Sequence, residues 1–149
     1  MSARIVCLGQ RHAGDDAVGL AVGDRLEARG VPVVLARDAA DLVDHLATSA
    51  RVVIVDAIVG ATPIGAVLHL GPEAVAEGVG LVSSHAFSVR QAVGLARALH
   101  GAASAGDLHV VAIAIARPDG PGDPSLGLSP EVAAAVEPAA RLAEQLATG

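Results

Sequence analysis

Residues 51–57 read Arg-Val-Val-Ile-Val-Asp-Ala, in which four consecutive apolar β-branched side chains precede an aspartate. A strand that is apolar at successive positions, rather than at alternate ones, is buried on both of its faces. Such burial is typical of a mostly parallel sheet that carries helices on each side. We therefore expect residues 51–57 to form a strand of this kind and to end in an acid.

Short β-branched runs alternate with Ala-rich stretches on either side of this segment. Further strands are expected at residues 4–8, 31–36, 66–70 and 108–116. Helices are expected at about 15–28, 40–46, 72–77, 88–99 and 129–146. This alternation predicts one α/β domain over residues 1–149. Its architecture would be a three-layer sandwich, with a mostly parallel twisted sheet of about five strands and helices on both faces.

Apolar side chains at helical spacing predict which faces of three helices point inward. In the first long helix these residues are Val18, Val22 and Leu26. In the helix that opens at Ser88 they are Ala92, Leu95, Ala96 and Leu99, and in the last helix they are Val132, Val136, Ala139, Ala143 and Leu146.

Composition and charge argue against several classes of partner. The chain has a formal net charge of −6, and all 10 of its cations are scattered Arg residues. Binders that follow nucleic-acid phosphates need clustered positive charge, so we expect no nucleic-acid partner. No apolar run reaches the roughly 18 residues of a membrane span. One cysteine, Cys7, cannot form an internal disulfide, and a cytoplasmic location is expected.

Polar side chains gather after the predicted strands. In open parallel sheets the ligand crevice lies beyond the carboxyl ends of the strands. The residues at those positions are Gln10, Arg11, His12, Asp15, Asp16, Asp38, Asp56 and His85. They form a polar group in an otherwise aliphatic chain and define a candidate metal or acid–base site.

Structural roles compete with chemical ones at each of these positions. An acid at a helix start, such as Asp15, can simply cap free N–H groups, which leaves Asp16 in need of another role. Asp56 could cap the turn at Gly60, but a carboxylate that ends a buried strand needs donors or a metal. Asp16, Asp56 and His85 together would suit Zn, Ni, Mn or Fe(II) and would leave coordination positions open.

Several segments resemble the hydrogenase maturation proteases. The family opens with a Gly-x-Gly-Asn turn and then Asp-Asp/Glu-x-x-Gly at the start of the first helix. Residues 7–10 and 14–19 follow this pattern, as do residues 55–59, Ser84-His85 and residues 127–132 further along. The resemblance covers nearly the whole chain in order.

The resemblance implies an α/β sandwich and a specific peptidase activity. These proteins remove the C-terminal extension of a nickel–iron hydrogenase large-subunit precursor after nickel insertion. Carried over, Asp16, Asp56 and His85 fall on the metal-binding and catalytic positions, and Asp38 falls on an acid implicated in substrate handling. We add Gln10 and His12 as expected substrate contacts. The cofactor would be a divalent metal, with nickel supplied by the substrate.

Some positions depart from the family pattern, and other functions stay open. Cys7 replaces the first Gly of the opening turn, Gln10 replaces its Asn, and residues 39–41 replace a Gly-Gly-Thr. One alternative is a non-catalytic chaperone that binds nickel or the precursor. Another is a hydrolase resembling peptidyl-tRNA hydrolases, although these use a basic RNA-facing channel. A nucleotide-binding fold is disfavoured because Gly9 has no Gly-x-Gly-x-x-Gly setting.

Overall fold

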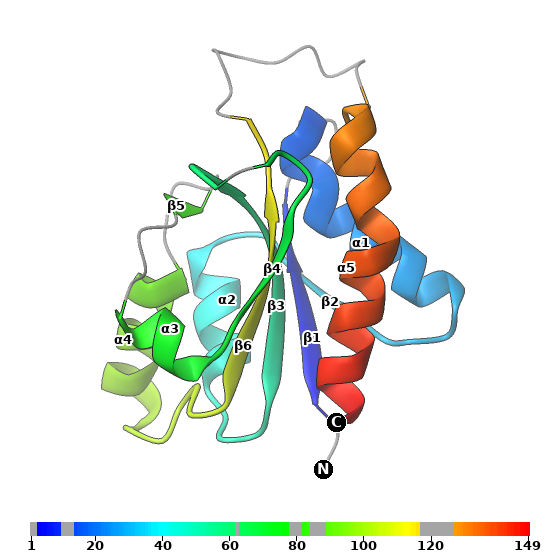
Figure 1. Cartoon of the computed structure of the whole chain (residues 1–149). Coiled ribbons are helices and arrows are strands. Elements are labelled where there is room, and N and C mark those ends of the chain that lie inside the picture. The colour runs from blue at the N-terminus through cyan, green and yellow to red at the C-terminus, as the bar shows by residue number, and fades with distance from the viewer. Residues whose placement is uncertain (1–2, 10–13, 62, 78–81, 84–88, 117–126) are drawn as a thin grey trace.

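A twisted sheet forms the middle layer of the molecule (Figure 1). The computed structural model describes residues 3–9, 14–61, 63–77, 82–83, 89–116 and 127–149. The strands are β1 (Arg4–Leu8), β2 (Val34–Ala36), β3 (Val52–Val59), β4 (Val67–Leu70), β5 (Val82–Ser83) and β6 (Leu108–Ala114). The helices are the 3₁₀ helix η1 (Gly14–Ala17), α1 (Val18–Ala28), α2 (Ala39–Leu46), α3 (Pro72–Glu77), α4 (Val89–His100) and α5 (Pro130–Thr148).

Strand order and direction confirm the predicted fold class. The order across the sheet is β2-β1-β3-β6-β4, and β5 pairs with β3 outside this path. The first four strands of that order are parallel to their neighbours, whereas β4 is antiparallel to β6 and β5 is antiparallel to β3. Five strands therefore form the body of a mostly parallel sheet, and a short sixth strand is added at one end of β3.

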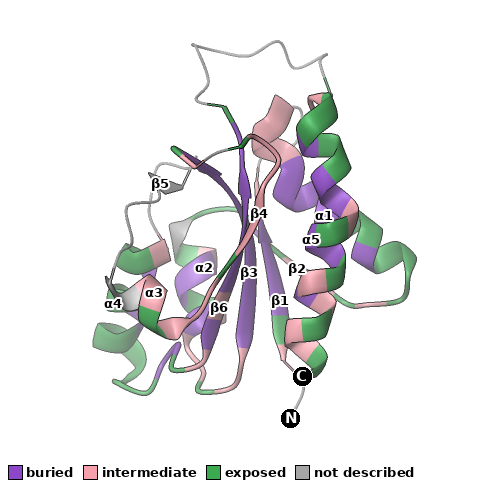
Figure 2. Ribbon diagram, viewed as in Figure 1, coloured by how far each residue is buried: buried purple, intermediate pink, exposed green. Residues whose placement is uncertain are grey.

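Two apolar cores lie on opposite faces of the sheet, as the run at residues 52–55 predicts. Val53 and Val55 point to the face covered by α1 and α5. Val52 and Ile54 point to the other face, where α2, α3 and α4 lie. Figure 2 shows β1, β3 and β6 largely buried between these two helical layers. All eight residues of β3 are buried, because β3 occupies the middle of the strand order.

The helix α1 lies unusually close to the sheet because of a glycine. A Cβ added to Gly19 would lie 2.1 Å from the carbonyl oxygen of Leu8 and 3.1 Å from that of Val55. Only a glycine allows this helix backbone to touch the last residue of β1 and the middle of β3. The preceding segment η1 is thereby held against the same end of the sheet, where it contacts β3.

The inward face predicted for α1 is confirmed, and the one predicted for α4 is partly wrong. Val18, Val22 and Leu26 are fully buried. In α4 the buried side chains are instead those of Ala92, Val93 and Ala96. Leu95 and Leu99, which were expected to face inward, are 48% and 64% exposed. The helix is rotated so that its smaller residues face α2 and the sheet, and its leucines face solvent.

Among the described helices none has both the length and the apolar character that crossing a membrane requires.

Candidate functional site

The carboxyl ends of β1 and β3 define the edge of the sheet where the sequence predicts a site. Cys7 pairs with Val55 in this parallel pair, so the last residue of β1 lies level with Asp56. Beyond that level β3 continues, and Ile58 and Val59 pair with β5 on the side that β1 has left. At this edge β3 therefore extends beyond the end of β1, and β5 pairs with the part of β3 that β1 does not reach.

Asp56 lies inside β3, and the strand continues beyond its predicted end at residue 57. The strand runs on to Val59, three residues beyond the acid. Asp56 is only 1% exposed, and it lies opposite Ala112 in the pairing of β3 with β6. By strand alternation it shares the α2/α4 face with Ile54 and Ile58. The carboxylate is thus rigidly held in a sheet interior, where burial without compensation is costly.

Asp16 reaches the same edge from η1. The chain after β1 passes close to it, since a Cβ added to Gly9 would lie 3.0 Å from the Asp16 carbonyl oxygen. Its Oδ1 atom is shielded from solvent and accepts no hydrogen bond from any part of the chain that the structure describes. A carboxylate oxygen that is shielded from water and accepts no hydrogen bond pays the cost of desolvation without compensation. This atom is therefore a candidate ligand for a positively charged group.

Asp15, the neighbour of Asp16, has a structural role that the sequence did not reveal. Its two carboxylate oxygens accept hydrogen bonds from the backbone N–H of Ser129 at 2.7 Å and from the Ser129 hydroxyl at 2.9 Å. Ser129 is the residue before α5, and it makes no side-chain cap to its own helix. Asp15 therefore ties the segment that carries Asp16 to the start of α5, instead of capping α1.

Asp38 follows β2 as expected and lies at the N-terminus of α2. Its Oδ1 accepts a hydrogen bond from the backbone N–H of Asp41 at 2.8 Å, so it is the N-cap of this helix. The residue is exposed, which leaves its carboxylate accessible from solvent. A role of Asp38 toward a substrate stays a prediction.

The remaining predicted residues lie outside the described part of the chain. These are Gln10, His12 and His85, and their roles stay predictions. Within the described ranges, no three His, Cys, Asp or Glu side chains are grouped so that they could hold a metal ion. The predicted metal site cannot be tested in this way, because its ligand His85 lies outside the described residues.

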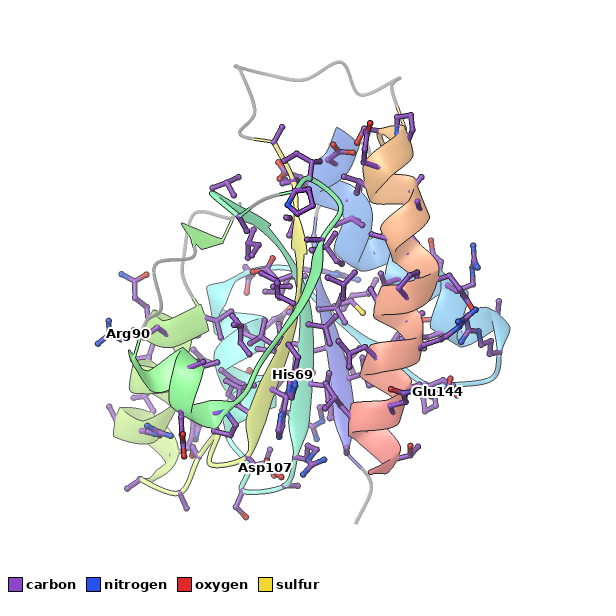
Figure 3. The ribbon with its side chains drawn as sticks, viewed as in Figure 1. His69, Arg90, Asp107 and Glu144 are labelled. Carbon is purple, nitrogen blue, oxygen red and sulfur yellow. The ribbon has the colours of Figure 1, made fainter. Side chains whose placement is uncertain are left out.

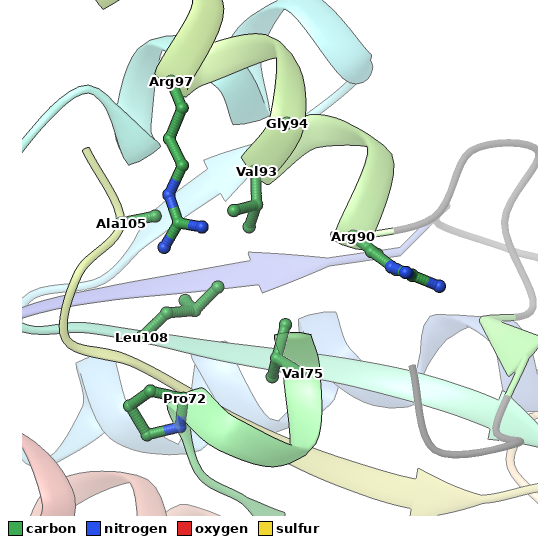
Figure 4. A pocket seen from close by; sticks show the side chains of 8 residues that line it. All are labelled: Pro72, Val75, Arg90, Val93, Gly94, Arg97, Ala105 and Leu108. Carbon is green, nitrogen blue, oxygen red and sulfur yellow. The ribbon is translucent and has the colours of Figure 1, made fainter. Parts of the chain in front are cut away.

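A separate pocket of about 190 Å³ lies on the α2/α4 face, between α3, α4 and the start of β6 (Figure 4). Val75 and Val93 line it, together with Arg97, whose Nε donates to the carbonyl oxygen of Ser104 at 3.0 Å. None of the described acids of the predicted site lines this pocket. It lies by the first residue of β6, Leu108, and so at the amino end of that strand.

Comparisons with known proteins agree with the predicted fold and family. The family model described as hydrogenase maturation protease matches residues 37–146. The NiFe hydrogenase maturation protease HybD from Thermococcus kodakarensis has a similar structure, with 28% identity, a TM-score of 0.78 and 99% of each chain covered. No curated protein matches the sequence significantly.

Two further solved structures share the fold. The NiFe hydrogenase maturation protease HycI from Thermococcus kodakarensis KOD1 has 24% identity and a TM-score of 0.66, over 99% of this chain and 90% of that one. The hydrogenase maturating endopeptidase HybD from E. coli has 22% identity and a TM-score of 0.69, over 95% of this chain and 89% of that one.

Proposed function

This chain belongs to the hydrogenase maturation protease family and is an endopeptidase, and we propose that it removes the C-terminal extension of a nickel–iron hydrogenase large-subunit precursor. The observation that carries the proposal is the placement of Asp16 and Asp56 at one edge of the sheet. They are 40 residues apart in sequence, and the contact between η1 and β3 brings their segments together.

Both acids are held in place before any substrate arrives. Asp56 is part of the most deeply buried strand, and Asp16 lies in a segment anchored by the hydrogen bonds of Asp15 to Ser129 and by the close packing of Gly19. Groups fixed in advance lose little entropy when a peptide binds, and they act on it without reorganisation. The exposed carboxylate of Asp38 is available to orient the incoming chain.

His85 is the third residue of the proposed site. The strand β5 pairs antiparallel with the end of β3, Ser83 with Ile58 and Val82 with Val59, so β5 itself runs toward the level of Asp56. His85 follows Ser83 by two residues in sequence. An imidazole beside two carboxylates is a ligand set for a borderline divalent metal and a group able to carry a proton near neutral pH.

The described acids fit a divalent cation. Asp16 presents a shielded carboxylate oxygen that accepts no hydrogen bond within the described chain, and Asp56 presents a second carboxylate that is 1% exposed. We propose that Asp16, Asp56 and His85 hold nickel that arrives with the precursor. When bound, such an ion supplies Lewis-acid polarisation of the scissile carbonyl. The protein residues would orient the peptide against it, with Gln10 and His12 contacting the substrate.

The experiment incubates the purified protein with a nickel-loaded hydrogenase large-subunit precursor and measures the precursor mass. We expect a shortened product, and we expect Asp16→Asn, Asp56→Asn and His85→Ala to abolish it while the circular dichroism spectrum is retained. His100→Ala, at the exposed end of α4, is the matched control and should cleave normally. Cleavage by any of the three variants would remove that residue from the site. If the wild type binds the precursor and does not shorten it, the proposed cleavage of this precursor is wrong.

The source of the metal is tested separately. Protein stripped with EDTA should cleave the nickel-loaded precursor and leave a nickel-free precursor intact. If the stripped protein needs added metal to cleave the loaded precursor, the ion is resident in the enzyme and the substrate-borne proposal is wrong.

A further inference from the structure

Two histidines on neighbouring strands are in direct contact far from the acids described above. His69 lies on β4 and His109 on β6, and the His69 Nε2 atom is 2.9 Å from the His109 Nδ1 atom. The two rings are stacked, with centroids 5.1 Å apart and planes at 22°. Alternation along the strands places both on the sheet face of Val67 and Val111.

The His109 ring is held from its other side. Its Nε2 atom is 2.8 Å from Asp107 Oδ1, and the Oδ2 of that carboxylate accepts a hydrogen bond from Arg51 Nε at 2.9 Å. Arg51 also donates to the Leu146 carbonyl oxygen at the end of α5, at 3.0 Å. An imidazole that donates its Nε2–H to a carboxylate keeps a lone pair on Nδ1, and here this lone pair faces His69. Figure 3 shows His69 and Asp107 on this part of the sheet.

A carboxylate behind an imidazole is the second-shell arrangement that metal-binding histidines use. It sets the ring orientation and raises the basicity of the nitrogen that faces the ion. The ion pair with Arg51 holds the Asp107 carboxylate in place behind the His109 ring. This pattern distinguishes the pair from two histidines that merely touch.

The spacing of the two nitrogens also suits a shared ion. Bonds of about 2.0–2.1 Å to one metal place two nitrogens in adjacent coordination positions about 2.9–3.4 Å apart. The two nitrogens are 2.9 Å apart as a hydrogen-bonded pair, so a bound ion would replace the proton of His69 Nε2 and the two rings would open slightly. His69 is exposed, so water can fill the remaining positions.

We propose that His69 and His109 form a surface site for a borderline divalent transition metal, such as Ni²⁺, Zn²⁺ or Cu²⁺, with Asp107 positioning His109. Imidazole nitrogens select these ions over Mg²⁺ and Ca²⁺, which prefer oxygen. His109 lies near the amino end of β6, opposite the sheet edge of Asp16 and Asp56. The proposal therefore does not depend on the peptidase function.

The first test isolates this site from the proposed peptidase site. The full chain carrying Asp16→Asn, Asp56→Asn and His85→Ala is stripped with EDTA and titrated with NiCl₂ or ZnCl₂ by calorimetry. We expect one ion per chain to bind, and we expect a further His69→Ala or His109→Ala substitution to remove that binding. His45→Ala, in the last turn of α2, is the control and should change nothing. Absence of binding before the further substitution, or binding that survives it, would overturn the proposal.

The second test identifies the ligands and the positioning residue. Cu²⁺ added to the same variant should give an electron paramagnetic resonance spectrum with coupling to two imidazole nitrogens, and to fewer after His69→Ala. Asp107→Asn should weaken Ni²⁺ binding by about 10- to 100-fold while keeping the two-nitrogen signature. An unchanged affinity would remove the positioning role from Asp107. A spectrum without two coupled nitrogens would contradict the shared site.

Discussion

The Asp15 carboxylate accepts hydrogen bonds from the backbone N–H of Ser129 at 2.7 Å and from the Ser129 hydroxyl at 2.9 Å, and the two residues are 114 positions apart in the sequence. This contact fastens the start of α5 to the segment before α1, and α1 and α5 pack together on the same face of the sheet. It therefore links two helices whose association completes one of the two cores.

Asp15→Ala should lower the free energy of unfolding by about 1.5–3 kcal/mol, because two hydrogen bonds to a charged acceptor are lost in a part-buried place. Ser129→Ala should cost less, since the backbone N–H bond remains. Urea unfolding of both single variants and the double variant gives the coupling between them. Asp44→Ala, an exposed acid of α2, serves as the control. An Asp15→Ala variant within about 0.5 kcal/mol of the wild type would contradict this role.

Gly19→Ala should be strongly destabilising, by about 3 kcal/mol or more, because the new methyl group would lie 2.1 Å from the Leu8 carbonyl oxygen, a backbone atom that cannot move aside. The matched control is Gly94→Ala in α4, where an added Cβ meets no atom within 4 Å. That change should stabilise the protein by about 0.5–1 kcal/mol through helix propensity. Equal effects at the two glycines, measured by urea unfolding, would contradict the close packing of α1.

Cys7 should be chemically silent in the folded protein. Burial raises the pKa of its thiol from 9.0 to about 12, with Glu27 and Asp24 adding to the effect. At pH 8 a thiol reagent should label the chain only after unfolding. Because the folded pKa is the higher one, the thiol contribution to stability is complete below pH 9.0 and is lost as the pH rises toward 12. Cys7→Ala should flatten this alkaline decline, and fast labelling of the native protein would contradict the burial.

Asp107 should contribute to stability at neutral pH and lose that contribution in acid. Hydrogen bonds from Arg51 and then from His109 hold the pKa of this carboxyl below 3.8. A depressed folded pKa stabilises the native state above the unfolded value, and the gain disappears as the pH falls through the folded pKa. Between roughly pH 5 and pH 2, the wild type should therefore lose more stability than Asp107→Asn. Parallel acid profiles, with Asp44→Asn as the control, would contradict the ion pair with Arg51.

Local patterns were sufficient for most of the secondary structure. The strand at Arg4–Leu8 and the short helix at Pro72–Glu77 have the predicted bounds. The run at residues 52–55 predicted burial on both faces, and all four residues are fully buried. Such features follow from side chains that are neighbours in sequence, so periodicity and β-branching reveal them.

The α4 helix shows where a local pattern is ambiguous. Two sets of apolar residues in this helix have the spacing of a buried face. One set is Ala92, Leu95, Ala96 and Leu99, and the other, which begins three residues earlier, is Val89, Ala92, Val93 and Ala96. The structure buries Ala92, Val93 and Ala96, packs a partly buried Val89 against the same core, and exposes Leu95 and Leu99. The helices that pack against α4 decide between the two stripes, and those helices lie elsewhere in the sequence.

The sequence by itself determined the α/β class, the alternation of strands and helices, and the acids Asp16 and Asp56 as residues that chemistry could use. Only the tertiary structure decided that β3 continues past Asp56 to Val59, that Asp15 binds Ser129, and that His69 meets His109 across 40 residues. The physical reason is that a pattern along the chain reports on periodicity, whereas a hydrogen bond depends on the register of strands and the depth at which a helix packs.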